Sequence, residues 1–355
     1  MSDDHRIKHI DAWRFIAVSL VIQGHLIVHS NFGFLVENYP FLRRIGRFGT
    51  LGVLFFFFIS GFVICRGLIV EKTSSSTISL KAFYIRRTLR ILPPLWLYLA
   101  ALIMLSTFFG LGINLSQIGK SALFLCNVDL VGGCSWYAGH TWSLSYEEQF
   151  YLIFPLIFLL AKLTVRPSFL IGILMIMVFA SLGLRGLGIL FWADYFSHMI
   201  FMLTGCSAGL YWPRLIIYFR RLTLNSWLFA LSILIVCAGL LPYPLVEYVQ
   251  TALFPPLIGL LVLGTPVAHP RIRAFFENAF VSYLGKISFT VYLWQQLATA
   301  PWPNQPVWWT LVFVLGVWLF AHYSYKYFER PLIGVAHQWS DRIKQSALTK
   351  HASGV

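Results

Sequence analysis

The sequence predicts an all-α protein, a polytopic bundle of transmembrane helices. Hydrophobic residues make up 58% of the 355 residues and charged residues only 11%, and the mean hydropathy is +0.73. Apolar runs of about 20 residues, the length that crosses the hydrocarbon core of a bilayer, recur from one end of the chain to the other. Helices satisfy their own backbone hydrogen bonds, so they are the structure expected for such runs in lipid.

About ten segments of this kind are expected to cross the membrane. In chain order they are 10–29, 49–69, 90–109, 144–163, 168–186, 190–212, 226–241, 247–267, 280–299 and 307–328. Lysine and arginine are concentrated in alternate connections and sparse in the connections between them. The positive-inside rule then places both termini in the cytoplasm.

The net charge of +14 follows from this topology, because the basic residues are spread over many short loops. That distribution argues against nucleic acid as a partner and favours contact with membrane lipids. The expected location is the bacterial cytoplasmic (inner) membrane. Residues 1–333 are expected to form one membrane domain, and residues 334–355 a polar cytoplasmic tail that is partly ordered at best.

The first span carries ionisable side chains, which are costly at membrane depth and are therefore functional candidates. Arg14 and His25 are about three helical turns apart, so they share one helix face and lie roughly 16 Å apart along the axis. Asp11 can pair with Arg14. A neutral imidazole at His25 can take a proton from an alcohol, and His29, nearer the interface, ranks second. The alternatives are an arginine anchored at the membrane surface and a hydrogen-bonded interior histidine. The span lacks a small-residue cleavage site, so it is expected to be retained.

A basic run leads into the third span. Arg87 and Arg90 are three residues apart and would present adjacent guanidinium groups on a helical turn, with Arg86 beside them. Adjacent guanidinium groups suit phosphate. The alternative is that any cytoplasmic loop collects arginine.

The fourth span opens with two adjacent carboxylates, Glu147 and Glu148. Acids near a helix N-terminus are favourable through the helix dipole, which is a purely structural explanation. They lie at the depth expected for His25, where a carboxylate can orient an imidazole or bind a polar acceptor.

The second span contains small residues that predict close helix contact, namely Gly49, Gly52 and Gly61. Ser60 could form a hydrogen bond across helices there. Packing is the main role expected for this span.

Cysteine usage leaves one question open. Cys126 and Cys134 lie in a loop expected outside the membrane, where both a disulfide and two free thiols are possible. Cys65, Cys206 and Cys237 fall in spans and are expected to fill small apolar gaps. No Cys/His cluster has metal-ligand spacing, so no metal is expected.

Taken together, these residues resemble the acyltransferase-3 family of integral membrane O-acyltransferases over nearly the whole chain. The motifs are Asp11-x-x-Arg14, Arg14-x10-His25, Gly52-Val53 with Phe55-Phe56 and Ser60-Gly61-Phe62, Arg87-x-x-Arg90, Trp142-Ser-Leu-x-x-Glu147-x-Gln149-Phe-Tyr151, Tyr292-Leu-Trp294 and Glu329-Arg330-Pro331. The resemblance implies transfer of an acyl group, usually acetyl, from cytoplasmic acyl-CoA to a hydroxyl of a carbohydrate or similar acceptor. It places Arg14, His25, Arg87 and Arg90 on functional motif positions and Glu147 on a recurrent glutamate.

The chain departs from the family in one motif. Many members have histidine after Tyr-Leu-Trp, where this chain has Gln295, so more weight falls on His25. Some members also carry a soluble esterase-like domain, and this chain is expected to be a standalone member without one.

The predicted function is therefore O-acetyl transfer from acetyl-CoA to an exported carbohydrate or glycolipid, such as a surface polysaccharide or lipopolysaccharide. His25, Glu147 and Arg14 are the predicted catalytic residues. Arg86, Arg87 and Arg90, with Arg14, would bind the donor, and the supporting residues are Asp11, Ser60, Glu148 and Tyr292. A transporter or flippase of a polar lipid or anionic solute is the main alternative, and a structural subunit of an envelope assembly is another.

Overall fold

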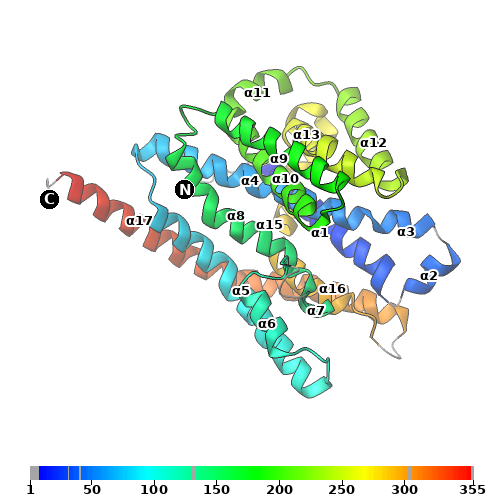
Figure 1. Cartoon of the computed structure of the whole chain (residues 1–355). Helices are drawn as coiled ribbons and strands as arrows, with labels where there is room; N and C mark the ends of the chain where they lie inside the picture. The colour runs from blue at the N-terminus through cyan, green and yellow to red at the C-terminus, as the bar shows by residue number, and fades with distance from the viewer. Residues whose placement is uncertain (1–7, 31, 40, 129–132, 303–305, 353–355) are drawn as a thin grey trace. The chain divides into compact units, whose positions relative to one another are not determined.

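The computed structural model describes residues 8–30, 32–39, 41–128, 133–302 and 306–352, and in these ranges its regular structure is helical, without strands (Figure 1). The all-α prediction is confirmed. In chain order the helices are α1 (Lys8–His29), α2 (Gly33–Asn38), α3 (Phe41–Gly46), α4 (Phe48–Ser75), α5 (Leu80–Phe109), α6 (Leu115–Ala122), α7 (Trp136–Gly139), α8 (Thr141–Leu160), α9 (Ser168–Gly186), α10 (Leu190–Leu210), α11 (Trp212–Phe219), α12 (Leu224–Leu240), α13 (Leu245–Ala268), α14 (Pro270–Phe276), α15 (Ala279–Ala298), α16 (Val307–Ser324), the π-helix η3 (Tyr325–Glu329) and α17 (Arg330–Ala352).

Each predicted span overlaps a helix, and most bounds agree to within a few residues, although α5 begins at Leu80 where the predicted span begins at residue 90. Among the described residues, however, six helices are long and apolar enough to cross a membrane, or seven if the bent pair α10 and α11 is one span. Helix α12 is apolar but has only 17 residues, which makes it shorter than these spans. The chain is thus a multi-pass helical membrane protein, and the count of ten spans is not confirmed.

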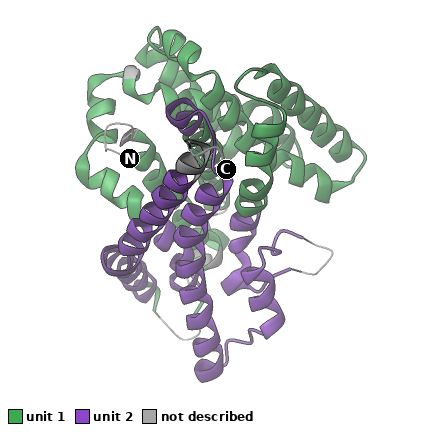
Figure 2. Ribbon diagram, turned by 90° about the vertical axis from the view of Figure 1, so that its left-hand side faces the viewer, with its two compact units in different colours: residues 1–69, 146–288, 301–307 green, residues 70–145, 289–300, 308–355 purple. Residues whose placement is uncertain are grey.

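The chain divides into two units, which are coloured separately in Figure 2. Unit 1 consists of residues 1–69, 146–288 and 301–307, and unit 2 of residues 70–145, 289–300 and 308–355. Within unit 1, α9 packs on α10, α10 and α12 pack on α13, and α1 contacts α3, α13 and α14. Within unit 2, α17 lies along α5, and α6 contacts both α5 and α7.

Glycines set the closest helix approaches in unit 1. A Cβ added at Gly24 of α1 would lie 2.7 Å from the Cα of Gly49 on α4, and one added at Gly52 would collide with the carbonyl oxygen of Ala17. A Cβ at Gly61 would likewise meet the backbone of Met202 on α10. The predicted packing role of the second-span glycines is confirmed, because only a residue without a side chain permits this separation.

The polar segment after residue 333, predicted to be a partly ordered tail, is instead the greater part of α17. There is no break at residue 334, and α17 packs along α5. The Lys344 Nζ lies 3.0 Å from the Glu71 carboxylate, and Ser340 accepts a hydrogen bond from Arg86. Polarity alone suggested disorder, whereas these polar side chains have partners within unit 2.

Candidate functional site

Helix α1 holds its first ionisable residues in a fixed local arrangement. Arg14 Nη1 donates a hydrogen bond to Asp11 Oδ1 at 3.2 Å, and the Asp11 side chain is buried while that of Arg14 is only slightly exposed. The predicted pairing is confirmed. Between them, Trp13 donates to the Thr265 hydroxyl at 2.9 Å and stacks on Phe55 with ring centroids 4.7 Å apart. This anchoring fixes the rotation of α1 about its axis.

His25 lies three turns further along the same unbroken helix and is half-buried. The residue before it, Gly24, is the point of closest approach to α4, and Gln23 donates to the Ile45 carbonyl at 3.2 Å. The backbone around the imidazole is therefore well supported. The side chain of His29, the second-ranked histidine, lies outside the described residues.

The α8 carboxylates lie in unit 1, near its aromatic core. Tyr151 donates a hydrogen bond to Glu147 Oε2 at 2.5 Å, which orients that carboxylate, and Glu148 is half-buried beside it. Tyr195 donates to Gln149 at 3.5 Å, which ties α8 to α10.

Sequence reasoning missed a half-buried histidine, His198 on α10. Its ring packs against Tyr146, with centroids 5.0 Å apart, and against Phe57 at 5.7 Å. A single histidine in an apolar run has no local signal of its own, so only the packing of α4, α8 and α10 makes it visible.

Ser60 does not form the predicted bond across helices, because its hydroxyl makes no hydrogen bond with any described residue. The contact between α4 and α10 is made by the next residue instead. The Gly61 carbonyl accepts from Cys206 Sγ at 3.2 Å. Ser60 remains a supporting residue by prediction alone.

In unit 2, Arg86 is held by other parts of the protein. Its guanidinium donates to the Glu71 carboxylate at 2.9 Å and to the Ser340 hydroxyl. Glu71 is buried and also accepts from Lys344 at 3.0 Å and from the backbone N–H of Ser79 at 3.0 Å. The sequence does not predict this network, which joins the end of α4 to α5 and α17.

The other two arginines of the run are half-buried on α5. The Arg87 guanidinium lies over the Phe83 ring, 5.8 Å from its centroid. The charge of Arg90 acts on the Glu329 carboxylate, which is buried and accepts hydrogen bonds from Thr290 at 2.5 Å and Ser324 at 3.3 Å. Glu329 ends the π-helix η3, and π-helical turns are frequent at functional sites.

Tyr292 belongs to a buried polar cluster of unit 2. Its hydroxyl donates to the His140 carbonyl at 2.8 Å and shares a 2.6 Å hydrogen bond with Ser143. The His140 ring, also missed by sequence reasoning, lies edge-on between Tyr98 and Tyr292. Gln295, the expected departure from the family motif, is buried and donates to Gln296 at 3.1 Å.

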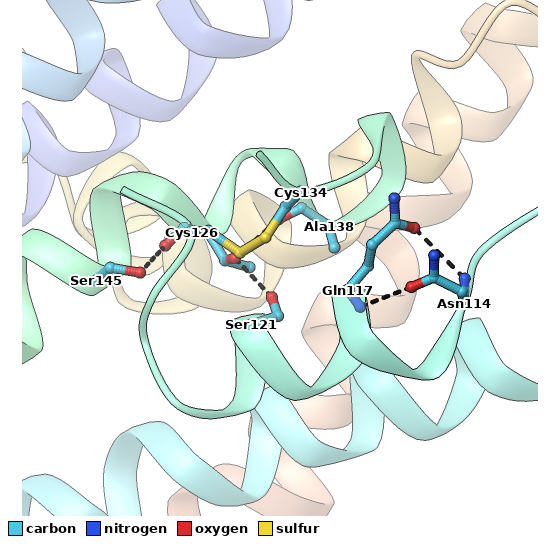
Figure 3. Close-up of a disulfide and its surroundings, with 8 residues drawn as sticks. Asn114, Gln117, Ser121, Cys126, Cys134, Ala138 and Ser145 are labelled. Atoms are coloured by element: carbon cyan, nitrogen blue, oxygen red, sulfur yellow. Dashed lines mark hydrogen bonds between the residues drawn. A yellow bond between two sulfur atoms is a disulfide. The ribbon is translucent and has the colours of Figure 1, made fainter. Parts of the chain in front are cut away.

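The open question about Cys126 and Cys134 is settled, since these two residues form a disulfide (Figure 3). Beside it, Ser121 and Thr141 share a 2.6 Å hydrogen bond, which fastens α6 to the start of α8. A capping box between Asn114 and Gln117 begins α6. The loop before α8 is therefore held at both ends.

The structure thus divides the predicted site residues between the two units. Unit 1 holds Asp11, Arg14, His25, Ser60, Glu147 and Glu148, and unit 2 holds Arg86, Arg87, Arg90 and Tyr292. Among the described residues, no group of three or more His, Cys, Asp or Glu side chains could hold a metal ion.

A multi-pass helical membrane protein with ionisable groups inside its spans is the class that this fold and these residues define. Within that class, the model of an acyltransferase domain family matches residues 7–325, and the chain belongs to this family. The family prediction is confirmed.

The curated relatives are bacterial proteins named as O-acetyltransferases. The peptidoglycan O-acetyltransferase OatA of Listeria monocytogenes is 25% identical over 364 residues, covering 92% of this chain and 56% of the relative. YrhL of Bacillus subtilis, provisionally named a peptidoglycan O-acetyltransferase, is 26% identical over 370 residues, covering 92% and 55%. The chain spans a little over half the length of these relatives. No solved structure matches the chain.

Proposed function

We propose that this chain is an O-acyltransferase of the bacterial cytoplasmic membrane. It moves an acyl group, most simply acetyl, from cytoplasmic acyl-CoA to a hydroxyl of an exported carbohydrate or glycolipid. The observation that carries the proposal is an acyltransferase domain whose first helix presents Asp11, Arg14 and His25 in a rigid local frame. The names of the relatives support an O-acetyl product and a glycan acceptor.

The donor's phosphates would bind at Arg87 and Arg90. Guanidinium groups match phosphate through paired, charge-assisted hydrogen bonds. Arg86 would contribute through its charge, since its hydrogen bonds are already directed to Glu71 and Ser340. Arg14, kept in place by Asp11, would line the path of the pantetheine arm.

The chemical step would take place at His25. The neutral imidazole removes the proton from the acceptor hydroxyl, and the oxygen attacks the thioester carbonyl. The C–S bond then breaks, the thiolate leaves with the electron pair, and the imidazolium returns a proton to it. Glu147, oriented by Tyr151, would bind the acceptor or orient the imidazole.

Incubation of the detergent-solubilised full chain with radiolabelled acetyl-CoA and envelope glycan tests the reaction itself. Label should appear in the glycan as an alkali-labile ester. Absence of any ester, combined with movement of a polar lipid or anionic solute by the same protein in vesicles, would favour the transporter alternative. Mass spectrometry of the surface glycans with and without the protein would then identify the acceptor.

Sidedness is tested separately. Opposite ends of the two helices carry His25 and Glu147, since His25 is late in α1 and Glu147 early in α8. In the predicted topology α1 runs outward from the cytoplasm and α8 runs back toward it. We therefore propose that both residues lie toward the outer surface. In a background lacking the 5 native cysteines, His25→Cys and Glu147→Cys should react with an impermeant thiol reagent from outside. Labelling from the cytoplasmic side alone would contradict the donor-inside, acceptor-outside arrangement.

A further inference from the structure

Helix α15 crosses α1 at the residue that pairs with Arg14. A Cβ added at Gly285 would collide with the carbonyl oxygen of Asp11 and would lie 2.9 Å from the Asp11 Cα. Helix α1 is long and apolar enough to span a membrane by itself, and Asp11 lies in its first turn. The crossing belongs to unit 1, which contains α1 and the part of α15 up to residue 288. The crossing therefore places the residues beside Gly285 relative to the first span.

The residue after Gly285 is a lysine that the proposed reaction does not use. Because consecutive Cα atoms are about 3.8 Å apart, the Cα of Lys286 lies within about 8 Å of the Cα of Asp11. Lys286 is half-buried, and Ser282 and Ile287 beside it on α15 are buried. A cation removed from water in this way is costly unless an anion compensates it.

The charges at the crossing do not balance among the residues that the structure describes. Arg14 makes a single hydrogen bond to a described residue, the one to Asp11. Lys286 forms neither a hydrogen bond nor an ion pair with any described residue. Two cations thus share one carboxylate in this part of unit 1, and one positive charge is left for an anion that the protein binds.

A second half-buried cation of unit 1 shows what is particular to Lys286. Arg66 on α4 likewise has no hydrogen bond or ion pair with a described residue. It follows Phe55, which stacks on Trp13 of α1, by about three helical turns, so roughly 16 Å of helix separate it from that contact. Of these two cations, Lys286 alone lies at the level of Arg14.

The distance from Arg14 to His25 fits one part of the proposed donor. The two residues are roughly 16 Å apart along α1. In coenzyme A, about thirteen covalent bonds separate the sulfur from the nearer phosphorus, and at about 1.2 Å per bond an extended arm spans roughly 15 Å. With the thioester carbonyl beside His25, the arm would therefore bring the diphosphate to the level of Arg14 and Lys286.

We infer that Lys286 and Arg14 together bind the diphosphate of the acyl-CoA donor at the crossing of α1 and α15. The inference rests on the proposed function, because it takes acyl-CoA as the donor and His25 as the place of transfer. Arg14 offers paired N–H donors and Lys286 a compact charge on a flexible stem, and both suit phosphate. The ribose phosphate of the donor would then be left to Arg87 and Arg90.

The test compares the affinities of coenzyme A, dephospho-coenzyme A and pantetheine for the detergent-solubilised full chain, measured by displacement of radiolabelled coenzyme A. Dephospho-coenzyme A lacks only the ribose phosphate, whereas pantetheine also lacks the diphosphate. Lys286→Gln should weaken binding of the first two ligands about tenfold, the loss of one charge-assisted contact, and should leave pantetheine unchanged. Lys286→Arg should recover most of the affinity. Arg66→Gln, the matched control, should bind all three ligands as the wild type does.

Two results would overturn the inference and leave the proposed function standing. One is unchanged coenzyme A binding by Lys286→Gln, and the other is an equal loss for all three ligands or in Arg66→Gln. A wild-type protein that binds no coenzyme A would contradict the proposed function, and the inference with it. If Lys286→Gln does not fold, labelling of Lys286 in the wild type with an amine-reactive reagent replaces it. Coenzyme A and dephospho-coenzyme A should protect Lys286 and pantetheine should not, and labelling that coenzyme A does not reduce would contradict the inference.

Discussion

Two arginines, one in each unit, meet their carboxylates in different ways. In unit 1, Arg14 pairs with Asp11 within a single turn of α1 at 3.2 Å. In unit 2, Arg86 pairs with Glu71 at 2.9 Å, and Lys344 of α17 reaches the same carboxylate at 3.0 Å. One helix can form the first pair by itself, whereas the second requires α4 and α5 to have packed, and the Lys344 contact requires α17 as well. Spacing in a sequence therefore identifies an arginine's partner only when that partner lies a few residues away.

The difference also separates the expected roles. The pair on α1 leaves the arginine on a helix that carries His25, where a fixed guanidinium can serve a reaction. The Arg86 pair holds α17 against α5, so its main contribution is structural. The following predictions, from the largest expected effect to the smallest, test this separation between a functional α1 and a structural Arg86 network.

His25→Ala should lower acyl transfer about 10²–10⁴-fold, because the variant lacks the general base. Initial rates with saturating acetyl-CoA measure the effect, and thermal unfolding should show a folded protein. His322→Gln, at a half-exposed histidine of α16, is the matched control and should retain activity. Near-normal turnover of His25→Ala would remove the assignment and make His29→Ala the next variant.

Glu71→Gln should reduce stability by about 3 kcal/mol, at the low end for breaking a buried ion pair. The reason is that Arg86 and Lys344 would lose their shared counter-charge, although both side chains reach solvent and are partly screened. Asp11→Asn should cost less stability, since it affects one local ion pair whereas Glu71 has two cationic partners. Unfolding temperatures in one detergent compare the two variants. A larger loss for Asp11→Asn would reverse the comparison.

Arg87→Ala and Arg90→Ala should each raise the donor KM about 10- to 100-fold, the equivalent of one charge-assisted contact of about 1.5–3 kcal/mol. Arg86→Ala should instead lower the unfolding temperature with a smaller change in donor KM. Steady-state kinetics with varied acetyl-CoA, at constant acceptor, separate the two effects. Arg→Lys variants should recover only part of the binding, because lysine lacks the planar fork. An unchanged KM in both Arg87→Ala and Arg90→Ala would return these residues to a topological role.

Gly52→Ala should destabilise the protein by about 1–3 kcal/mol, because the added methyl group collides with the Ala17 carbonyl on the helix that carries Arg14 and His25. Gly67→Ala is the matched control on the same helix. It has no atom within 4 Å of the new Cβ and should stabilise by about 0.5–1 kcal/mol. If both substitutions are equally tolerated, α1 and α4 do not depend on this close contact.

The helices themselves were predictable, because hydrophobic runs of spanning length admit little else in lipid. The pairing of Asp11 with Arg14 was also predictable, as three residues on a helix bring side chains together. The polar segment of α17 was not. Its side chains look suited to solvent in the sequence, and only their contacts with Arg86 and Glu71 explain an ordered helix.

In the candidate site, only the residues that belong to motifs with helical spacing were predictable from the sequence. His25, Arg87 and Arg90 belong to short motifs whose spacing has a direct helical meaning. His140 and His198 belong to none, and each is revealed by aromatic rings from other helices. The bond across helices considered for Ser60 is not formed with any described residue, and the hydrogen bond at this approach is accepted by the Gly61 carbonyl.

The sequence by itself determined the class of this protein, its helices and the pair of Asp11 and Arg14 on α1. Composition identifies whole apolar spans, and helical spacing brings together residues that are three or four positions apart. Only the tertiary structure decided that Cys126 bonds to Cys134 and that Glu71 neutralises Arg86. Cys126 and Cys134 lie 8 residues apart in one loop, and Glu71 and Arg86 lie on different helices, so both pairings are beyond the reach of helical spacing. They depend on which helix faces meet, and that choice is made by the packing of the folded chain.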